Sequence, residues 1–538
     1  MAAGTNQKRQ GASAITHTGL LRFQAQRCGP KPALWFRNRA WTFAELAETT
    51  ERWAALLASL GVAARQRVAF CAPNSPLAVA LPYAAWACGA VATPLSPRAT
   101  RDEVVRLLAH SGASLLIVGN TLRELGQAVA SDAGVPVFVA SEFADAAWEP
   151  LGPDRMPPGA TPRPAPAAAA VLAYTSGTTG MPKGVLLSRD NLQWACLACS
   201  AARGDTGREI GAALSHISHT PVFVSHVLCR LWMGASVVLF ERFDVNELLE
   251  ATERFGITDL TLIGGMVHDV VRLGSIPEGV RRAVRKVTVG GAATPMADKE
   301  ALREMFPGAE IIEAYGQSEA TDGVTMSRGS EVFDFPGTVG RTNPHVVVRI
   351  RRADGSFAEP GAEGEIVVAG PTVMMGYWRD AAATRAAIRA GWLHTGDVGL
   401  QDEHGFLYLT GRLKHLIITG GENVAPAEVE EVLRQHPGVL EVAVIGTPHP
   451  KWGEQVTAIV VPRPGRTVRA EELIAFSETR LAGFKKPRRI EFVESLPRNA
   501  TNKVDLRALQ ERFGHKEPAS GTAIPAGHQP DEPNEVRT

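Results

Sequence analysis

The sequence predicts an α/β fold with a large N-terminal domain, made of two stacked α/β sheet subdomains plus a small β-barrel, and a small α+β C-terminal domain. Three observations carry this prediction. Helical stretches alternate with short apolar runs from Thr42 onward, as in layers packed on a mostly parallel sheet. Short strands separated by glycine turns fill residues 330–410. After Gly411–Lys414, a further pattern of roughly 100 residues has the size of a small domain.

The first α/β stretch alternates a clear helix with buried strands. Phe43–Leu60 predicts an amphipathic helix that Gly61 closes. Arg67–Cys71 and Ser114–Val118 are apolar runs of strand length. The apolar run Ala78–Leu95 contains two prolines and a glycine, so we interpret it as a buried helix followed by a strand rather than as a membrane span.

A second α/β stretch covers about Val171–Ala320. The residues before it, 150–170, are rich in Pro, Gly and Ala, and we interpret them as a surface connection because the α/β rhythm resumes at once. The glycine-separated strands that come next are expected to form a small β-barrel or β-sandwich. They are Val346–Ile350, Gly364–Val368 and Phe406–Leu409.

The final unit is expected to combine two helices with three strands. In order, these are the helix Pro426–Arg434, the strands Leu440–Gly446 and Val456–Val461, the helix Ala470–Leu481 and the strand Ile490–Val493. We therefore place the N-terminal domain at residues 1–413 and the C-terminal domain at residues 414–515. Residues 516–538 are polar and Pro-rich and are predicted to form a disordered tail.

Composition disfavours several classes of protein. The 56 basic residues equal the 56 acidic ones, so no global field recruits nucleic acid or a membrane surface. Six cysteines in 538 residues do not make a disulfide scaffold, and no signal-peptide pattern is seen, so a cytoplasmic location is expected. Cys196 and Cys199 have metal-ligand spacing, but no second pair accompanies them, and we interpret them as buried thiols.

The most specific segment is the loop Tyr174–Val185, Y-T-S-G-T-T-G-M-P-K-G-V. It follows the apolar strand Ala169–Ala173 and is expected to lead into a helix. Its glycines let the backbone approach a ligand closely, while its hydroxyls and Lys183 supply donors and positive charge. Together they predict a cradle for a polyphosphate. Met181 and Pro182 precede the lysine, which distinguishes the loop from a Walker A motif.

This loop resembles the phosphate-loop signature of the adenylate-forming superfamily, which includes acyl- and aryl-CoA synthetases, peptide-synthetase adenylation domains and beetle luciferases. The resemblance runs from about Trp41 to Leu506 and rests on further motifs in the family's order. These motifs are Gly290–Pro295, Tyr315–Glu319, Gly391–Asp397, Gly411–Lys414 and Asn499–Lys503. The chain is most similar to benzoate-, halobenzoate- and medium-chain acyl-CoA ligases.

The resemblance implies that these motifs bind ATP and Mg²⁺ and activate a carboxylate as its acyl-AMP. Lys183 and Thr178 would hold the phosphates, and Glu319 would bind Mg²⁺. Lys503 would bridge the attacking carboxylate and the α-phosphate, where negative charge peaks in the transition state. The remaining candidate nucleotide contacts are Thr175, Ser176, Gly177, Thr179, Gly180, Gly291, Ala292, Ala293, Tyr315 on adenine, Gly316, Gln317, Ser318, and Asp397 and Arg412 on the ribose.

Lys503 lies in the predicted C-terminal domain, far from Lys183 in sequence, so that domain must close over the first to complete the site. The resemblance implies that this mobile domain rotates about a hinge at Lys414 and then presents another face to coenzyme A. The residues that match the CoA face are Gly420, Gly421, Trp452, Phe484, Lys486 and Arg488, with Arg98 a further candidate on the large domain. The implied cofactors are ATP, Mg²⁺ and coenzyme A.

The acid pocket is the least specific part of the sequence. By resemblance His219 lies near the substrate carboxylate; from the residues alone, a packed loop histidine is an equal reading. His216, His219 and His226 lack the carboxylate or thiolate spacing of a zinc site. Gly290–Ala293 and Thr220–Val227 are mostly small or apolar, which favours an apolar aromatic, alicyclic or medium-chain acid.

The sequence thus predicts a carboxylic acid–CoA ligase that acts on a small-molecule acid. A stand-alone enzyme that loads the acyl group onto a carrier-protein phosphopantetheine is the alternative. A catalytically inactive ligand binder is disfavoured because Lys183 and Lys503 are both present. A luciferase has no specific support in the chain. Neither nucleic acid nor a membrane is expected as a partner, and a homodimer stays open.

Overall fold

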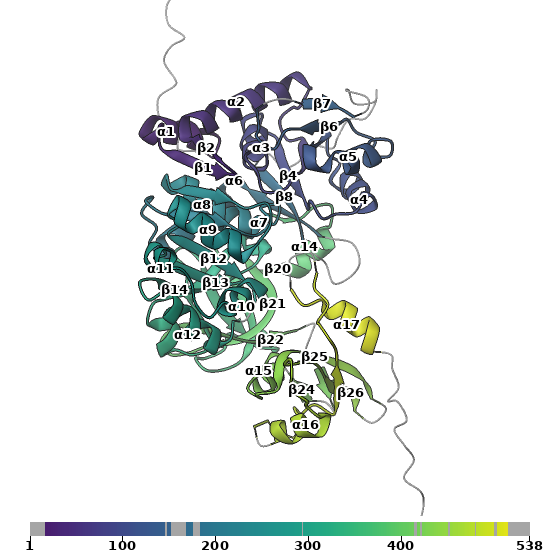
Figure 1. The fold of residues 1–538 in the computed structure, drawn as a ribbon. Helices are drawn as coiled ribbons and strands as arrows, with labels where there is room; N and C mark the ends of the chain where they lie inside the picture. Colours follow the sequence, from purple (N-terminus) through teal and green to yellow (C-terminus); the bar gives the residue numbers. More distant parts are fainter. Residues whose placement is uncertain are drawn as a thin grey trace, which may run out of the picture. The chain divides into compact units, whose positions relative to one another are not determined.

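The chain divides into two compact units (Figure 1). The computed structural model describes residues 17–145, 148–151, 168–175, 183–292, 294–413, 417–419, 422–424, 426–449, 452–478, 480–481, 483–499 and 503–514. The large unit holds the described residues up to Leu413 together with Arg498, Asn499 and Lys503, and the small unit holds the rest. The predicted tail lies outside the described residues.

One sheet of the large unit has eight strands in the order β19-β9-β8-β4-β3-β5-β6-β7. Its strands are β3 (Arg67–Cys71), β4 (Val91–Leu95), β5 (Leu115–Gly119), β6 (Val137–Ala140), β7 (Trp148–Pro150), β8 (Ala169–Thr175), β9 (Lys183–Ser188) and β19 (Gly376–Tyr377). The central strands run parallel, whereas β9 and β19 add antiparallel strands at one end. The two expected strands around residues 67 and 114 are confirmed as β3 and β5.

The second sheet has fourteen strands, with the path β17-β18-β21-β22-β16-β15-β14-β13-β12-β10-β11-β1-β2, and β20 pairs with β21. Its strands are β1 (Pro32–Phe36), β2 (Arg39–Thr42), β10 (Ile210–Ala213), β11 (Ser236–Leu239), β12 (Asp259–Ile263), β13 (Lys286–Gly290), β14 (Glu310–Gly316), β15 (Gly323–Arg328), β16 (Thr338–Thr342), β17 (Val347–Arg351), β18 (Gly364–Ala369), β20 (Ile388–Arg389), β21 (Trp392–Gln401) and β22 (Phe406–Arg412). The strands β10 to β14 are parallel, and those from β15 to β22 are antiparallel.

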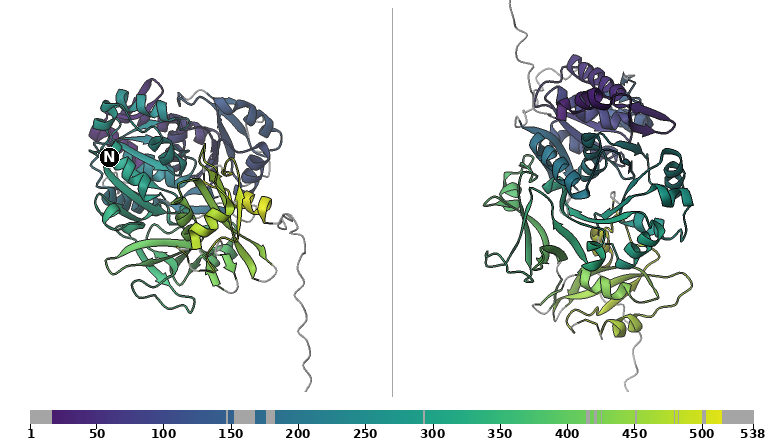
Figure 2. Two further views of the ribbon diagram at one scale, coloured as in Figure 1. Left: turned by 60° about the horizontal axis from the view of Figure 1, so that its bottom comes forward. Right: turned by 90° about the vertical axis from the view of Figure 1, so that its left-hand side faces the viewer.

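The strands of residues 330–410 do not close into the expected small barrel. β16 pairs with β15, so these strands continue the large sheet, and among the described residues no closed barrel is present. The strand order joins the green strands of this region in Figure 2 to the teal ones of the large unit in one sheet. As a consequence, β21 and β22 belong to the same hydrogen-bonded sheet as β14. The sheet therefore fixes the positions of their side chains relative to the carboxyl ends of the parallel strands.

Helices pack around and between the two sheets. They are α1 (His17–Cys28), α2 (Phe43–Ser59), α3 (Pro76–Ala87), α4 (Arg101–Ser111), α5 (Arg123–Ala130), α6 (Arg189–Arg203), α7 (Thr220–Val222), a π-helical turn (Phe223–Leu228), α8 (Cys229–Met233), α9 (Val245–Phe255), α10 (Gly265–Val271), α11 (Glu278–Ala283), α12 (Met296–Met305), α13 (Glu331–Asp334) and α14 (Ala381–Ala387). The helix predicted at Phe43–Leu60 is confirmed. Thr42 and Glu45 form a capping box at its start, and Gly61 follows its end at φ +83°.

The apolar run Ala78–Leu95 is confirmed as a buried helix followed by a strand, α3 and β4. Every residue of α3 except the last, Ala87, is buried. The indole nitrogen of Trp86 donates to the carbonyl of Ala170 at 2.8 Å, and its ring lies 6.4 Å from that of Phe223. The helix therefore packs between β8 and the π-helical turn. Within the described residues, no helix is long and apolar enough to cross a membrane.

The small unit contains a five-stranded sheet with the path β24-β23-β26-β25, and β27 pairs in parallel with β26. Its elements are β23 (Ile417–Thr419), β24 (Glu422–Val424), α15 (Pro426–Arg434), β25 (Val439–His449), β26 (Gly453–Pro462), α16 (Ala470–Glu478), β27 (Arg489–Phe492) and α17 (Leu506–Phe513). All five elements predicted for this unit are confirmed, with ends that differ by a few residues. β23, β24 and α17 were not predicted.

Candidate active site

Several of the predicted motifs follow the carboxyl ends of β13 and β14. These two strands are parallel neighbours, with Gly290 paired with Ala314, so the turns that follow them lie at one edge of the sheet. In open parallel sheets, this edge is where ligands bind. Gly291 follows β13 at φ +72°, and a Cβ there would lie 2.8 Å from the side chain of Ile263. Glycine is therefore required at this close approach.

The turn after β14 is closed by backbone contacts. The amide of Gln317 donates to the carbonyl of Asp322 at 3.1 Å, and a Cβ on Gly316 would lie 1.9 Å from that same oxygen. Thr321 takes φ +70°, and its hydroxyl donates to the carbonyl of Thr372 at 2.5 Å. This turn carries the predicted residues Gly316, Gln317, Ser318 and Glu319 in a fixed loop.

Tyr315, Asp397 and Arg412 form one hydrogen-bonded cluster. The hydroxyl of Tyr315 donates to Oδ2 of Asp397 at 2.6 Å, and Arg412 pairs with Oδ1 of the same carboxylate. Asp397 and Arg412 lie opposite each other in the β21–β22 ladder. Burial, followed by the negative charge of Asp397, raises the pKa of Tyr315, which therefore stays a neutral donor. Three side chains predicted to contact adenosine are thus brought together.

The phosphate-loop motif lies in a β-hairpin, which corrects the expected strand-to-helix turn. β8 and β9 are antiparallel, with Thr175 opposite Lys183, and α6 begins only at Arg189 after β9 has ended. The apolar run Val185–Leu187 belongs to β9, which separates the loop from the helix, α6, that the sequence predicted to follow it. The predicted residues Ser176, Gly177, Thr178, Thr179 and Gly180 lie outside the described residues.

Lys183 and Glu319 meet at Tyr377, a residue that the sequence analysis missed. The ammonium of Lys183 lies 4.6 Å from the centre of the Tyr377 ring, and the Tyr377 hydroxyl donates to Oε1 of Glu319 at 2.9 Å. Burial, together with the charge of Glu319, raises the pKa of Tyr377. The sequence signal was weak, because Tyr377 stands in a two-residue strand far from both partners.

Lys503 belongs to the large unit. It lies in the electrostatic field of the cluster of Tyr315, Asp397 and Arg412, which is named the adenosine cluster for the contacts predicted for it. Although its side chain keeps contact with solvent, partial burial of the ammonium and the charge of Arg412 lower the pKa of Lys503, whereas Asp397 raises it. The charge of Lys503 reaches His219 as well. Burial first, and Lys503 second, lower the pKa of His219 to about 4, so its imidazole is neutral at physiological pH.

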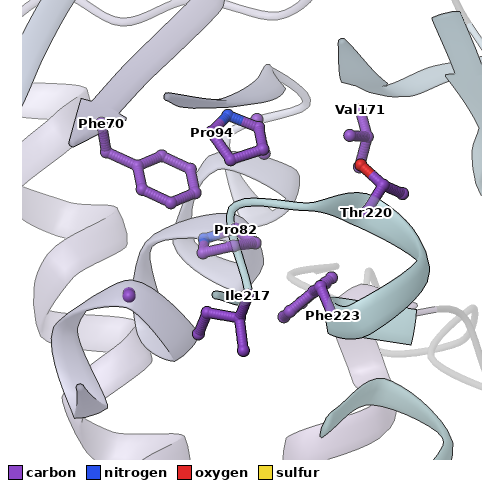
Figure 3. A pocket seen from close by; sticks show the side chains of 9 residues that line it. Phe70, Pro82, Pro94, Val171, Ile217, Thr220 and Phe223 are labelled. Carbon is purple, nitrogen blue, oxygen red and sulfur yellow. The ribbon is translucent and has the colours of Figure 1, made fainter. Parts of the chain in front are cut away.

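A small apolar cavity borders the segment that follows His219 (Figure 3). Its volume is about 10 Å³, which is room for one water-sized group. It is lined by Phe70, Ala78, Pro82, Ala92, Pro94, Val171, Ile217, Thr220 and Phe223. Among these side chains only that of Thr220 carries an oxygen, and within the described residues its buried hydroxyl has no hydrogen-bond partner.

The other two histidines of the group are neutral as well. Burial lowers the pKa of His216 to about 4 and that of His226 to about 3. Nearby arginines, Arg98 for His216 and Arg230 for His226, act in the same direction. In the described part of the chain, no three or more His, Cys, Asp or Glu side chains are grouped so that they could together hold a metal ion.

The predicted CoA residues of the small unit are only partly brought together. Trp452 stacks on His449 with ring centres 4.1 Å apart, and the guanidinium of Arg488 lies 3.7 Å from the centre of the Trp452 ring. Lys486 is paired with Glu478 at 2.6 Å. Phe484 packs against the apolar core of this unit. The predicted residues Ala293, Lys414, Gly420 and Gly421 lie outside the described residues.

Cys196 and Cys199 are buried free thiols, as predicted. Cys229 joins them, and the thiol of Cys199 donates to Asp322 at 3.6 Å. Burial raises the pKa of Asp322 to about 8, with the charge of Cys229 contributing in the same direction, so this carboxyl is protonated at neutral pH. The cluster thus contacts the turn that carries Glu319 through Asp322.

The donor set fits a triphosphate with a hard divalent cation. Lys183 offers a cation, and Glu319 keeps its second carboxylate oxygen without a hydrogen bond among the described residues. Carboxylate oxygens are the ligands that Mg²⁺ prefers in proteins. A profile described as AMP-binding enzyme matches residues 21–378, and one described as AMP-binding enzyme C-terminal domain matches residues 428–503.

The chain belongs to the AMP-binding enzyme family. A feruloyl-CoA synthase from Amycolatopsis is 36% identical over 475 residues, which cover 88% of this chain and 94% of that protein. An indoleacetate–CoA ligase from Aromatoleum aromaticum is 34% identical over 498 residues, which cover 90% and 96% of the two proteins. The structure of o-succinylbenzoate CoA synthetase from Bacillus subtilis with its acyl-adenylate intermediate matches with a TM-score of 0.80 and 30% identity, over 93% of this chain and 99% of that one. The synthetase structure thus shares the fold of this chain.

Proposed function

We propose that this AMP-binding enzyme is a carboxylic acid–CoA ligase. ATP and the acid give an acyl-AMP and pyrophosphate, and the thiol of coenzyme A then takes the acyl group and releases AMP. The observation that carries the proposal is the convergence of two sets of residues in the large unit. Lys183 and Glu319 meet at Tyr377, and Tyr315, Asp397 and Arg412 form the second cluster, with Lys503 in its field.

The first step brings two anions together, which requires positive charge at the site. The substrate carboxylate attacks the α-phosphorus, one P–O bond forms, and the bond to the β-phosphate bridging oxygen breaks. Lys183 would hold the phosphates that leave as pyrophosphate, and Glu319 would hold a Mg²⁺ ion, which supplies positive charge to offset the phosphate oxygens. Lys503 stabilises the charge that peaks on the α-phosphate in the transition state. Asp397 and Arg412 fix the ribose, so the α-phosphate cannot shift.

In the second step the thiol attacks the acyl carbonyl, and AMP leaves with the electron pair of the broken C–O bond. AMP is a good leaving group because its phosphate carries the negative charge that is released. The C-terminal domain, residues 414–515, is assigned to this step after a rotation about Lys414. Trp452 and Arg488 support the assignment, since an aromatic face and a guanidinium suit the adenine and phosphates of coenzyme A.

This assignment to coenzyme A has a direct mutational test. Trp452→Ala should raise KM for coenzyme A about tenfold and leave acid-dependent ATP–pyrophosphate exchange unchanged, because the indole lies in the small unit. Trp148→Ala, at a half-exposed tryptophan of the large unit, is the matched control and should change neither reaction. Equal loss of both reactions in Trp452→Ala would contradict the assignment.

The substrate is proposed to be an apolar acid of the aromatic, alicyclic or medium-chain class. The cavity beside Thr220 is too small to hold the acid itself, but the other side chains around it, among them two phenylalanines and two prolines, are apolar and carry no charge. The neutral state of His219 favours a hydrogen bond to the carboxylate over an ion pair. The feruloyl- and indoleacetate-specific relatives, named for aromatic acids, support the same class. The six free cysteines support a cytoplasmic location for this activity.

The deciding experiment is ATP–pyrophosphate exchange over a panel of carboxylates, followed by addition of coenzyme A. Aromatic acids should support exchange better than short polar acids, and coenzyme A should then give a thioester. Failure of exchange with every acid would remove the proposal. Exchange without a thioester would favour the alternative acceptor, a carrier-protein phosphopantetheine.

A further inference from the structure

We infer that Tyr377 is a positioning residue that holds Lys183 and Glu319 apart and aims both at the metal-bound triphosphate. The inference rests on the proposed adenylation site. It assigns a role to a side chain that no motif of the sequence analysis contained. Tyr377 contacts neither the substrate acid nor coenzyme A in this assignment, and acts through its two charged neighbours.

The geometry places a single phenol between two opposite charges. The ammonium of Lys183 faces the ring at 4.6 Å, and the hydroxyl donates to Oε1 of Glu319 at 2.9 Å. Within the described part of the chain, neither Lys183 nor Glu319 takes part in an ion pair. A cation–π contact holds the ammonium, and a hydrogen bond from a neutral donor holds the carboxylate.

This separation has a physical consequence for ligand binding. If Lys183 and Glu319 paired directly, each would neutralise the other, and both a phosphate and a metal ion would have to displace the partner first. With Tyr377 between them, the ammonium keeps its donors for phosphate oxygens. The carboxylate keeps its second oxygen for a cation, because the hydroxyl occupies only Oε1. Hydrogen bonds of this kind orient a ligating carboxylate and strengthen metal binding.

The backbone around Tyr377 joins the two sheets that supply the charges. The amide of Met374 donates to the carbonyl of Glu319 at 2.8 Å, on the turn after β14 of the large sheet. The amide of Trp378 donates to the carbonyl of Gly184 at 2.7 Å, on β9 of the smaller sheet, where Tyr377 is paired with Val185. Residues 374–378 therefore fix the spacing between the lysine from one sheet and the carboxylate from the other.

Two substitutions separate the functions of the hydroxyl and the ring. Tyr377→Phe removes the hydrogen bond to Glu319 and keeps the ring under Lys183, whereas Tyr377→Leu removes both. Tyr408→Phe is the matched control, because the Tyr408 hydroxyl also donates to a carboxylate, that of Asp402 at 3.2 Å, away from the site. Thermal unfolding of all three variants shows whether each is folded before any binding is measured.

Binding is measured on the full chain without acid or coenzyme A, using Mn²⁺ as a paramagnetic probe in the presence of ATP, and ATP alone with a chelator present. Tyr377→Phe should weaken Mn²⁺ binding about tenfold and leave metal-free ATP binding unchanged. Tyr377→Leu should weaken both. Tyr408→Phe should match the wild type in both measurements.

Wild-type affinity for Mn²⁺ in folded Tyr377→Phe would overturn the inference, and so would equal losses of metal-free ATP binding in the two variants. Pyrophosphate exchange adds an independent readout, because KM for MgATP should rise in Tyr377→Phe more than kcat falls. Exchange that is absent even from the wild type would count against the proposed function itself. The two failures are therefore distinguishable.

Discussion

The nucleotide end and the acid end of the candidate site are built in opposite ways. At the nucleotide end, Tyr315, Asp397 and Arg412 are bonded to one another, and Lys183 and Glu319 share Tyr377. At the acid end, the walls are apolar, and the Thr220 hydroxyl lies buried without a partner among the described residues. Polar side chains that are already bonded to one another suit a ligand that is the same in every reaction, such as a nucleotide. A site with apolar walls selects its acid mainly by size and shape, so one or two substitutions can alter which acid it accepts.

Among the substitutions that test this comparison, the largest effect is expected at Lys503. Lys503→Ala should lower the rate of acyl-AMP formation by about 10²- to 10³-fold, because transition-state charge on the α-phosphate loses its stabilising cation. Thioester formation from supplied acyl-AMP should stay nearly intact. The two half-reactions are measured separately, by pyrophosphate exchange and by thiol consumption. Equal losses in both would show that Lys503 is not dedicated to the nucleotide end.

A smaller loss is expected at the adenosine cluster. Asp397→Asn keeps the shape of the side chain but removes the charge that pairs with Arg412 and accepts from Tyr315. Hydrogen bonds to charged groups contribute about 1.5–3 kcal/mol, so KM for ATP should rise roughly 10- to 100-fold. Relative preference among acids should not change. A shift in acid preference would mean that the two ends of the site are not independent.

At the end of the site proposed for the substrate acid, the contribution of His219 to stability should depend on pH. The folded pKa of His219 is about 4, below its ordinary value near 6.5, so the unfolded chain binds a proton more readily across this interval. His219 therefore destabilises the fold as the pH falls through that window. The free energy of unfolding of the wild type minus that of His219→Gln should drop by about 1–2 kcal/mol between pH 7 and pH 5. Urea unfolding at both pH values measures the difference, and a constant difference would show that His219 is not buried as a neutral ring.

The smallest effect is expected at Thr220. Thr220→Val keeps the side-chain shape and removes a buried hydroxyl that lacks a partner, so the free energy of unfolding should rise by about 1 kcal/mol. Exchange with apolar acids should stay within a few-fold of wild type. Urea unfolding and the acid panel test both points. A destabilised variant would show that the hydroxyl is satisfied, for example by an ordered water.

Much of the fold followed from local sequence rules. The helix Phe43–Ser59 carries its own capping box and terminal glycine, and α15 begins and ends where the sequence indicated. The barrel prediction was wrong because glycine turns identify strands but not their partners, and the pairing of β15 with β16 is a contact between segments. The strand β9, which lies between the phosphate loop and the helix predicted after it, was missed for a related reason. The short apolar run of β9 has no period that distinguishes a strand from a buried helix.

The site shows the same division. Motifs with several unusual residues in one stretch, such as the turn at Gly316, could be found from the sequence alone. A Cβ at this position would clash with the backbone, so the turn requires glycine there. Tyr377 could not, since its importance comes from two partners 194 and 58 positions away in numbering, and nothing near it in the chain marks it. The role of a side chain that separates two others can be recognised only from the three-dimensional structure.

The pairing of Asp397 with Arg412 across β21 and β22 has a mechanical consequence. Leu413 is the last described residue of the large unit before the chain first continues into the small one, so tension along this connection acts directly on β22. That strand carries Arg412, and its neighbour carries the carboxylate, so a pull that peels β22 away would open the adenosine contacts before it disturbs the parallel strands. This covalent connection between the units is therefore coupled mechanically to the residues that we propose to hold the ribose.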